Sequence, residues 1–308
     1  MAGVTEALGS AEFTHPALFY RGLDDYLDGV GGFLRAGLAA GEPVFAAVPP
    51  DRLAPLRDHL GADGDRAHLV DMAEAGRNPG RIMTALTDFA GRRGSGRAWL
   101  VGEPIWASRT PAEIREATRH EALINLAFAD VPVTILCPYD VSGLSPEVIA
   151  DAARTHPVLW RDGEEKPSPA YDDPMIVATG CDAADAAGAD AECREFDPAN
   201  LIAVRAWALE FGQAAGLSED RSFDLKLAVG EAVANSVRHG GGRGSLTLWR
   251  APGGGVVAQV RDTGRLADPL VGRRRPAPGA ANGRGLWMIH HLSDLVEFAP
   301  GVIRLHVS

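Results

Sequence analysis

Residues 218–240 read SEDRSFDLKLAVGEAVANSVRHG, and this stretch decides how the C-terminal half of the chain folds. Its apolar residues recur at three- and four-residue steps, which is the spacing of one face of an α-helix. The face predicted to pack on a sheet consists of Leu225, Val229, Ala232, Val233 and Ser236. A second group of side chains gathers along one edge of the same helix and consists of Asp224, Ala228, Glu231, Asn235 and Arg238.

Glu231 and Asn235 on this edge are one helical turn apart, so a carboxylate and a carboxamide point into the same space. Such a pair suits Mg²⁺, which takes oxygen ligands and keeps several waters while it bridges phosphates. The alternative is a solvated helix edge on which the two side chains stand together by chance. The helix alone does not decide between these two interpretations.

Two segments further along the chain favour a nucleotide site. Val260-Arg-Asp262-Thr-Gly264 ends a predicted strand, where Asp262 can accept a hydrogen bond from an exocyclic amine and Gly264 lets a planar base approach the backbone. Taken alone, Asp-x-Gly is also an ordinary turn after a strand. Asn282-Gly283-Arg284-Gly285-Leu286 then opens a predicted helix, and glycines at a helix N-terminus leave N–H groups free to hold a phosphate.

The segments around these motifs predict an α+β domain with two layers. Its helices are expected at residues 198–215, 218–239 and 285–295, and its strands at 194–196, 245–250, 256–262, 296–298 and 302–307. The second and third strands are expected to pair as a hairpin through Ala251-Pro-Gly-Gly-Gly255.

The first half of the chain alternates short apolar runs with helical patterns, which predicts an α/β domain with a largely parallel sheet. Strands are expected at 44–48, 67–70, 98–101 and 133–137, and helices at 23–38, at 111–129 and after Ser145, which can cap its helix. Residues 162–192 are rich in charged residues, Pro, Ala and Gly and predict a linker. The expected division is therefore 1–161, 162–192 and 193–308.

Composition excludes several classes of protein. The length of 308 residues suggests two domains at roughly 150 residues each. The net charge of -11 is unfavourable for direct nucleic-acid binding, and no apolar run reaches the ~18 residues of a membrane span. The three cysteines lack CxxC spacing, and neither lysine belongs to a P-loop. MAGVTEALGS lacks the features of a signal peptide, so we expect a soluble cytoplasmic protein.

The order Glu-x-x-x-Asn, Asp-x-Gly and Gly-x-Gly over roughly residues 193–308 resembles the GHKL ATPase family. EAVANSVRHG followed by GRGL is most similar to the RsbW/SpoIIAB type of anti-sigma factor serine kinase. The resemblance implies the two-layer GHKL (Bergerat) fold, with ATP and Mg²⁺ as cofactors. The fuller DxGxG pattern is not met, because Leu266 stands where the second glycine would be.

The same resemblance assigns roles to individual residues. It implies that Asn235 ligates Mg²⁺, that Glu231 is the general base toward the attacking hydroxyl, and that Asp262 binds the adenine amine. The residues that it implies along the nucleotide are Gly264, Gly283, Arg284 and Gly285.

In the first half, residues 119–128 (RHEALINLAF) and Cys137-Pro-Tyr-Asp140 resemble the MEDS sensory domain, which implies a small-molecule ligand. Glu121 and Asn125 repeat the Glu-x-x-x-Asn spacing, but no Gly-x-Gly follows them in order. Two interpretations remain open for this pair: an internal hydrogen-bonded pair that holds the helix to the sheet, or a contact to the ligand. Cys137 is either an inert core thiol or a reactive or ligand-contacting cysteine.

Together these resemblances predict an ATP-binding anti-sigma factor with serine/threonine kinase activity toward a STAS-type anti-sigma antagonist, under control of the N-terminal domain. Its expected partners are a sigma factor, the antagonist and a second copy of the chain in a homodimer, with no membrane and no direct nucleic-acid contact. One alternative is an ATP-gated binding module without phosphotransfer. Another is a two-component histidine kinase that uses His120, which we expect instead to be a surface histidine outside any dimerisation hairpin.

Overall fold

The computed structural model describes residues 13–92, 96–182, 186–277, 279 and 283–308. The chain forms two compact units, one mainly from residues 13–178 and the other mainly from residues 179–308. No helix among the described residues is both long and apolar enough to cross a bilayer.

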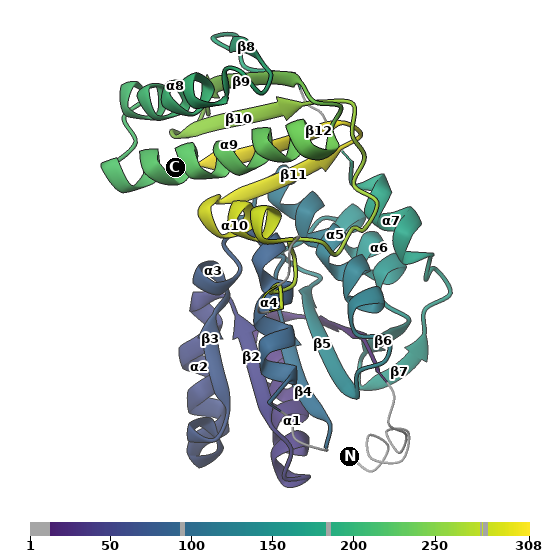
Figure 1. The fold of residues 1–308 in the computed structure, drawn as a ribbon. Helices are drawn as coiled ribbons and strands as arrows, with labels where there is room; N and C mark the ends of the chain where they lie inside the picture. Colours follow the sequence, from purple (N-terminus) through teal and green to yellow (C-terminus); the bar gives the residue numbers. More distant parts are fainter. Residues whose placement is uncertain (1–12, 93–95, 183–185, 278, 280–282) are drawn as a thin grey trace. The chain divides into compact units, whose positions relative to one another are not determined.

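The N-terminal unit is built on a seven-stranded sheet with the order β3-β2-β4-β5-β1-β6-β7 (Figure 1). All neighbouring strands in it run parallel except β7, which pairs antiparallel with β6. The strands are β1 (Pro16–Tyr20), β2 (Val44–Val48), β3 (His68–Asp71), β4 (Ala98–Gly102), β5 (Val133–Asp140), β6 (Val158–Arg161) and β7 (Glu164–Pro167). The predicted largely parallel sheet is confirmed.

The helices of this unit are α1 (Gly22–Ala39), α2 (Pro50–Leu60), α3 (Met72–Ala75), α4 (Pro79–Ala90), α5 (Pro111–Ala127), α6 (Pro146–Thr155) and α7 (Pro174–Gly180), with a 3₁₀ turn at Gly61–Asp65. The apolar stripe of α1 packs with α2 on one face of the sheet, because Tyr26, Phe33 and Leu34 belong to the same core as alternate residues of β1, β2 and β4. The opposite face carries Cys137 of β5, which contacts α5.

Serine side chains cap two helices, and the first of these caps was predicted. Ser145 caps α6 by accepting a hydrogen bond from the backbone N–H of Val148 at 3.5 Å. Ser218 does the same for α9 with Arg221 at 3.2 Å. The segment expected to be a linker includes the strand β7 and the helix α7.

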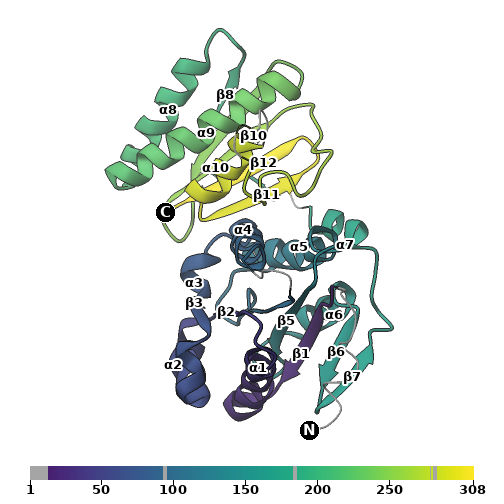
Figure 2. The same ribbon diagram turned by 60° about the horizontal axis from the view of Figure 1, so that its bottom comes forward.

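The C-terminal unit has two layers, as predicted. Its antiparallel sheet has the order β11-β12-β10-β9-β8 and consists of β8 (Glu192–Phe196), β9 (Gly244–Arg250), β10 (Val256–Arg261), β11 (Leu295–Ala299) and β12 (Val302–Val307). The helices α8 (Leu201–Ala214), α9 (Glu219–His239) and α10 (Arg284–Leu292) cover one face of it (Figure 2). The hairpin between β9 and β10 pairs Val256 with Arg250, as the Gly-rich turn predicts.

The core of this unit lies between the helices and that face of the sheet. The predicted sheet-facing side of α9 is fully buried, from Leu225 to Ser236. Its partners on the strands are alternate residues such as Leu246, Ala258 and Leu305. Since α9 is fixed by this packing, its polar edge holds a defined position at the side of the core.

Candidate functional site

The predicted pair on α9 meets the first turn of α10. Glu231 and Asn235 are half-buried on the edge of α9. A Cβ atom placed on Gly285 would lie 2.7 Å from Oε2 of Glu231 and 3.3 Å from Nδ2 of Asn235. The backbone of α10 therefore begins directly against both side chains, and glycine is the residue that allows this approach.

The start of α10 carries no side-chain cap from the described residues on its first backbone N–H groups. Gly283 precedes the helix with φ 90°, a conformation that glycine adopts without strain. Because glycine has no side chain, it makes no capping hydrogen bond to the helix. Arg284 is the first helical residue and is exposed. The first N–H groups of such a helix lack intrahelical partners and carry the positive end of its dipole. Asn282 of the predicted motif lies outside the described residues.

Asp262 follows β10 and is held beside α9. Its Oδ2 accepts a hydrogen bond from the hydroxyl of Ser236, and its Oδ1 accepts one from the backbone N–H of Gly264 at 2.7 Å. Because Ser236 directly follows Asn235 in the chain, this bond brings the predicted Asp-x-Gly segment to the same end of α9 as the Glu231–Asn235 pair. Each carboxylate oxygen has a second lone pair, so Asp262 retains the capacity to accept from a ligand.

The turn after Asp262 is joined to the end of α9 by close backbone contacts. Thr263 donates its backbone N–H to the carbonyl oxygen of Gly240 at 3.1 Å. A Cβ atom on Gly264 would lie 3.0 Å from the Cα of Gly240. Leu266, which replaces the second glycine of the fuller pattern, is 46 % exposed.

Sequence reasoning missed the role of Ser236. Its position on the buried face of α9 indicated packing, and it is indeed 2 % exposed, but its hydroxyl also orients the Asp262 carboxylate. A serine among aliphatic residues on a core-facing stripe was the available signal, because a buried hydroxyl needs a partner.

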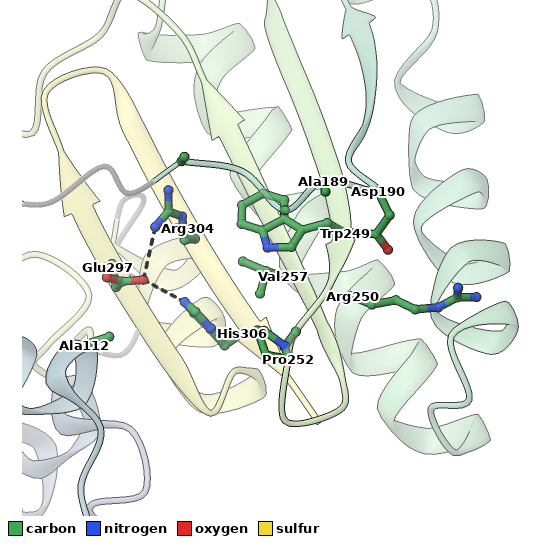
Figure 3. Close-up of a pocket in the computed structure, with 13 residues that line it drawn as sticks. Ala112, Ala189, Asp190, Trp249, Arg250, Pro252, Val257, Glu297, Arg304 and His306 are labelled. Atoms are coloured by element: carbon green, nitrogen blue, oxygen red, sulfur yellow. Dashed lines mark hydrogen bonds and ion pairs between the residues drawn. The ribbon is translucent and has the colours of Figure 1, made fainter.

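A second concave region lies on the opposite face of the same sheet, away from α8–α10. This pocket of about 510 Å³ is lined by Trp249, Val257, Glu297, Arg304 and His306, among others (Figure 3). Three of its ionisable side chains are paired with each other, since Glu297 lies 2.7 Å from Nε2 of His306 and 3.7 Å from Arg304. None of the predicted site residues lines it.

The N-terminal unit carries a polar cluster where β1, β2 and β4 end. The hydroxyl of Tyr20 donates to Oε1 of Glu103 at 2.8 Å, and the guanidinium of Arg52 lies 5.8 and 5.4 Å from the ring centres of Tyr20 and Tyr26. Burial raises the pKa of Glu103 to about 8, against the opposing hydrogen bond from Tyr20. In open α/β sheets, ligands bind at the carboxyl ends of the strands, which is where this cluster lies.

The expectation of a surface histidine in α5 is wrong. The side chain of His120 is only 1 % exposed. The helix is buried almost all around over residues 116–125, so its polar residues lie in the interior of the protein rather than on a solvated stripe.

Comparisons with known families match both units. Residues 14–157 match the model of the MEDS domain, described as the methanogen/methylotroph, DcmR sensory domain. Residues 195–306 match the model of the histidine kinase-like ATPase domain. No match was found among the curated proteins. The chain therefore consists of a MEDS sensory domain followed by a histidine kinase-like ATPase domain.

Proposed function

We propose that this protein is an ATP-binding anti-sigma factor that phosphorylates an anti-sigma antagonist on serine or threonine. The observation that carries the proposal is the contact of Gly285 with both Glu231 and Asn235. It brings a carboxylate, an amide oxygen and a helix N-terminus together at one end of α9, which are the groups that phosphoryl transfer requires for positioning and for charge neutralisation.

The residues present fit Mg²⁺ and ATP in the proposed roles. Asn235 supplies an oxygen ligand for Mg²⁺, which keeps its remaining positions for water and phosphate oxygens. The backbone N–H groups at the start of α10, around Gly283, Arg284 and Gly285, hold phosphate oxygens. Asp262 accepts a hydrogen bond from the adenine amine, and the close approach of Gly264 to Gly240 keeps the backbone beside it free of side chains.

Glu231 is the proposed general base. A bound Mg²⁺, held by Asn235, would supply positive charge that neutralises the charge developing on the phosphate oxygens. Glu231 orients the hydroxyl of the antagonist's serine and takes up its proton as the oxygen attacks the γ-phosphorus of ATP, while the bond from that phosphorus to the β,γ-bridging oxygen breaks and ADP leaves. Oε2 of Glu231 lies beside the start of α10, in space that a Cβ atom at residue 285 would occupy and that glycine leaves open.

The proposed partners are a sigma factor and a STAS-type antagonist, and the proposed assembly is a homodimer in the cytoplasm. The net charge of -11 supports protein partners rather than direct binding to nucleic acid. The MEDS domain controls this output by binding a small molecule, and the buried cluster of Glu103, Tyr20 and Arg52 at the ends of the parallel strands supports a ligand position there.

A binding module without phosphotransfer is the second candidate, because the same site would hold ATP in either case. A histidine kinase that uses His120 is disfavoured, since a phosphoacceptor histidine must reach the γ-phosphate and this side chain is 1 % exposed.

The test combines two variants of the full chain. Calorimetric titration with a non-hydrolysable ATP analogue and Mg²⁺ should show saturable binding that Asn235→Ala weakens at least tenfold and Glu231→Gln preserves. Radiolabelled phosphate should then pass from ATP to the serine of a candidate antagonist with the wild type but not with Glu231→Gln. Binding without transfer to any antagonist would favour the gated module, and normal transfer by Glu231→Gln would refute the assignment of the base.

A further inference from the structure

Four side chains with metal-binding atoms meet inside the MEDS domain, far in sequence from any residue of the proposed ATP site. They are His15, Glu121, Cys137 and His156, and one ligand atom from each lies within 4.8 Å of all the others. All four are buried, and the exposed fraction of each is 0 %. We propose that this cluster is a binding site for a divalent transition metal, with Zn²⁺ as the first candidate.

The distances fit a common central ion. Oε2 of Glu121 lies 3.1 Å from Nε2 of His15, 3.2 Å from Sγ of Cys137 and 3.4 Å from Nε2 of His156. Sγ of Cys137 lies 3.4 Å from Nε2 of His15. Ligand atoms at the usual zinc distances and tetrahedral angles are separated by about 3.3–3.6 Å, so the cluster needs only a small adjustment to hold the ion.

The fold brings these residues together from four different segments. Cys137 lies on β5, and the neighbouring strand β1 begins directly after His15. Ala17 pairs with Cys137, and His15 lies two residues before Ala17. The side chains of His15 and Cys137 are therefore on the same face of the sheet. Glu121 comes from α5, which covers that face, and His156 ends α6. An ion at this point would link β1, β5, α5 and the end of α6.

Hydrogen bonds to the outer nitrogen of each histidine leave Nε2 free to act as a ligand. Asn125 donates its amide N–H groups to backbone carbonyls, including that of Thr155 at 2.8 Å. Its Oδ1 therefore faces Nδ1 of His15 at 3.1 Å and accepts a hydrogen bond from the N–H there. Nδ1 of His156 lies 2.8 Å from the carbonyl oxygen of Ala152, which can only accept. Metal-bound histidines have this arrangement, in which an outer acceptor fixes the tautomer.

The cluster lacks the protons that a purely hydrogen-bonded core would need. When the ring protons of His15 and His156 are on Nδ1, both Nε2 atoms present lone pairs to the anionic carboxylate of Glu121. Among these four side chains, the Cys137 thiol is then the remaining hydrogen-bond donor. Oε1 of Glu121 and Nε2 of His156 are buried without a hydrogen-bond partner among the described residues.

The donor set also selects the class of metal. Two imidazoles and a thiolate favour Zn²⁺ and its transition-metal neighbours over Mg²⁺ and Ca²⁺, which prefer oxygen. With four protein ligands and no exposed position, the site matches closed, structural zinc sites rather than catalytic ones, which keep a position open for water. Glu121 and Asn125 are therefore parts of one site, the first as a ligand and the second as a residue that positions His15.

The experiment uses the full chain with a purification tag free of histidine and cysteine. The protein is unfolded, stripped of metal with a chelator, refolded with or without Zn²⁺, desalted and analysed by mass spectrometry for its metal content. We expect one zinc per chain, retained on dialysis against EDTA and released on unfolding, and a higher thermal midpoint than for the protein refolded without zinc. Refolding with Co²⁺ should give a thiolate-to-cobalt charge-transfer absorption.

Variants assign the site to these residues. Cys137→Ser and His156→Asn should lose the metal, and Cys137→Ser should also lose the cobalt–thiolate absorption. Cys193→Ser, which alters the exposed cysteine of β8, is the matched control and should keep both. Asn125→Ala should bind zinc roughly 10–100-fold more weakly, as expected for a residue that orients a ligand.

Folded wild-type protein without bound metal after refolding with Zn²⁺ would overturn the proposal, and it would show that the four groups share protons instead. Retention of zinc by both Cys137→Ser and His156→Asn would also overturn it, because the ion would then lie elsewhere. Circular dichroism of each variant checks that loss of metal is measured on folded protein.

Discussion

Oε2 of Glu231 would lie 2.7 Å from a Cβ atom on Gly285, so α10 begins in contact with the carboxylate that we propose as the general base. Real Cβ atoms do not approach another atom so closely. This relationship makes the identity of residue 285 a direct probe of the site, because any larger side chain must displace Glu231 or the start of α10.

We expect Gly285→Ala to weaken binding of Mg²⁺ and an ATP analogue at least tenfold, which corresponds to about 1.4 kcal/mol. The added methyl group would push Glu231 and Asn235 away from the N–H groups of α10. Calorimetric titration of the full chain measures the change. Gly253→Ala is the matched control, because a Cβ atom at Gly253 would meet nothing within 4 Å. Equal affinity of Gly285→Ala and the wild type would exclude this end of α10 from the nucleotide site.

Ser236→Ala tests whether the orientation of Asp262 matters for nucleotide binding. The substitution removes the hydroxyl that donates to Oδ2 of Asp262, and among the described residues the carboxylate is then held through Gly264 on its other oxygen. We expect affinity for the ATP analogue to fall by roughly tenfold, since a hydrogen bond to a charged group contributes about 1.5 kcal/mol.

Ser222→Ala on the same helix is the control for Ser236→Ala. Its hydroxyl is also buried but has no hydrogen-bond partner among the described residues, so its removal should leave nucleotide affinity unchanged. Titration of both variants with adenosine diphosphate and with inorganic phosphate would locate the effect. A loss specific to the adenine-containing ligand supports Asp262 as the base contact, and an equal loss with phosphate contradicts it.

Much of the ATPase domain could be predicted from sequence because its signals are local. The buried stripe of α9, the cap at Ser218 and the Gly-rich turn of the β9–β10 hairpin each depend on residues close in the chain. The three motifs lie on separate elements, and their convergence at one end of α9 followed from the family resemblance rather than from any spacing within the sequence.

Other features depend on tertiary contacts that a linear pattern does not contain. β1 (Pro16–Tyr20) was not predicted, although it is a short apolar run like the predicted strand at 44–48, and its pairing with β5 and β6 identifies it. His120 was expected on the surface because it lies outside any dimerisation hairpin, but α5 is buried on nearly all sides over residues 116–125. The meeting of His15 with Cys137, 122 positions away, could not be read from sequence either.

The stability of the MEDS domain should fall as pH rises, because of Glu103. Burial raises the pKa of this carboxyl from 4.5 to about 8, so the folded state binds the proton more tightly than the unfolded state does. The contribution of Glu103 is then fully favourable below about pH 4.5, is lost progressively between about pH 4.5 and 8, and stays constant at higher pH. The shift corresponds to at most about 5 kcal/mol, and relaxation of the site reduces this figure.

Glu103→Gln should remove this dependence, because the amide stays neutral at every pH and its oxygen still accepts from the hydroxyl of Tyr20. We expect the variant and the wild type to have similar free energies of unfolding near pH 5 and the variant to be more stable at pH 8.5. Urea unfolding of the full chain, compared between the two proteins at each pH, cancels the titration of all other groups. Glu74→Gln, at an exposed position of the same domain, is the control and should track the wild type at both pH values. If the difference between Glu103→Gln and the wild type is the same at pH 5 and pH 8.5, the Glu103 carboxyl ionises in the folded protein as readily as in water.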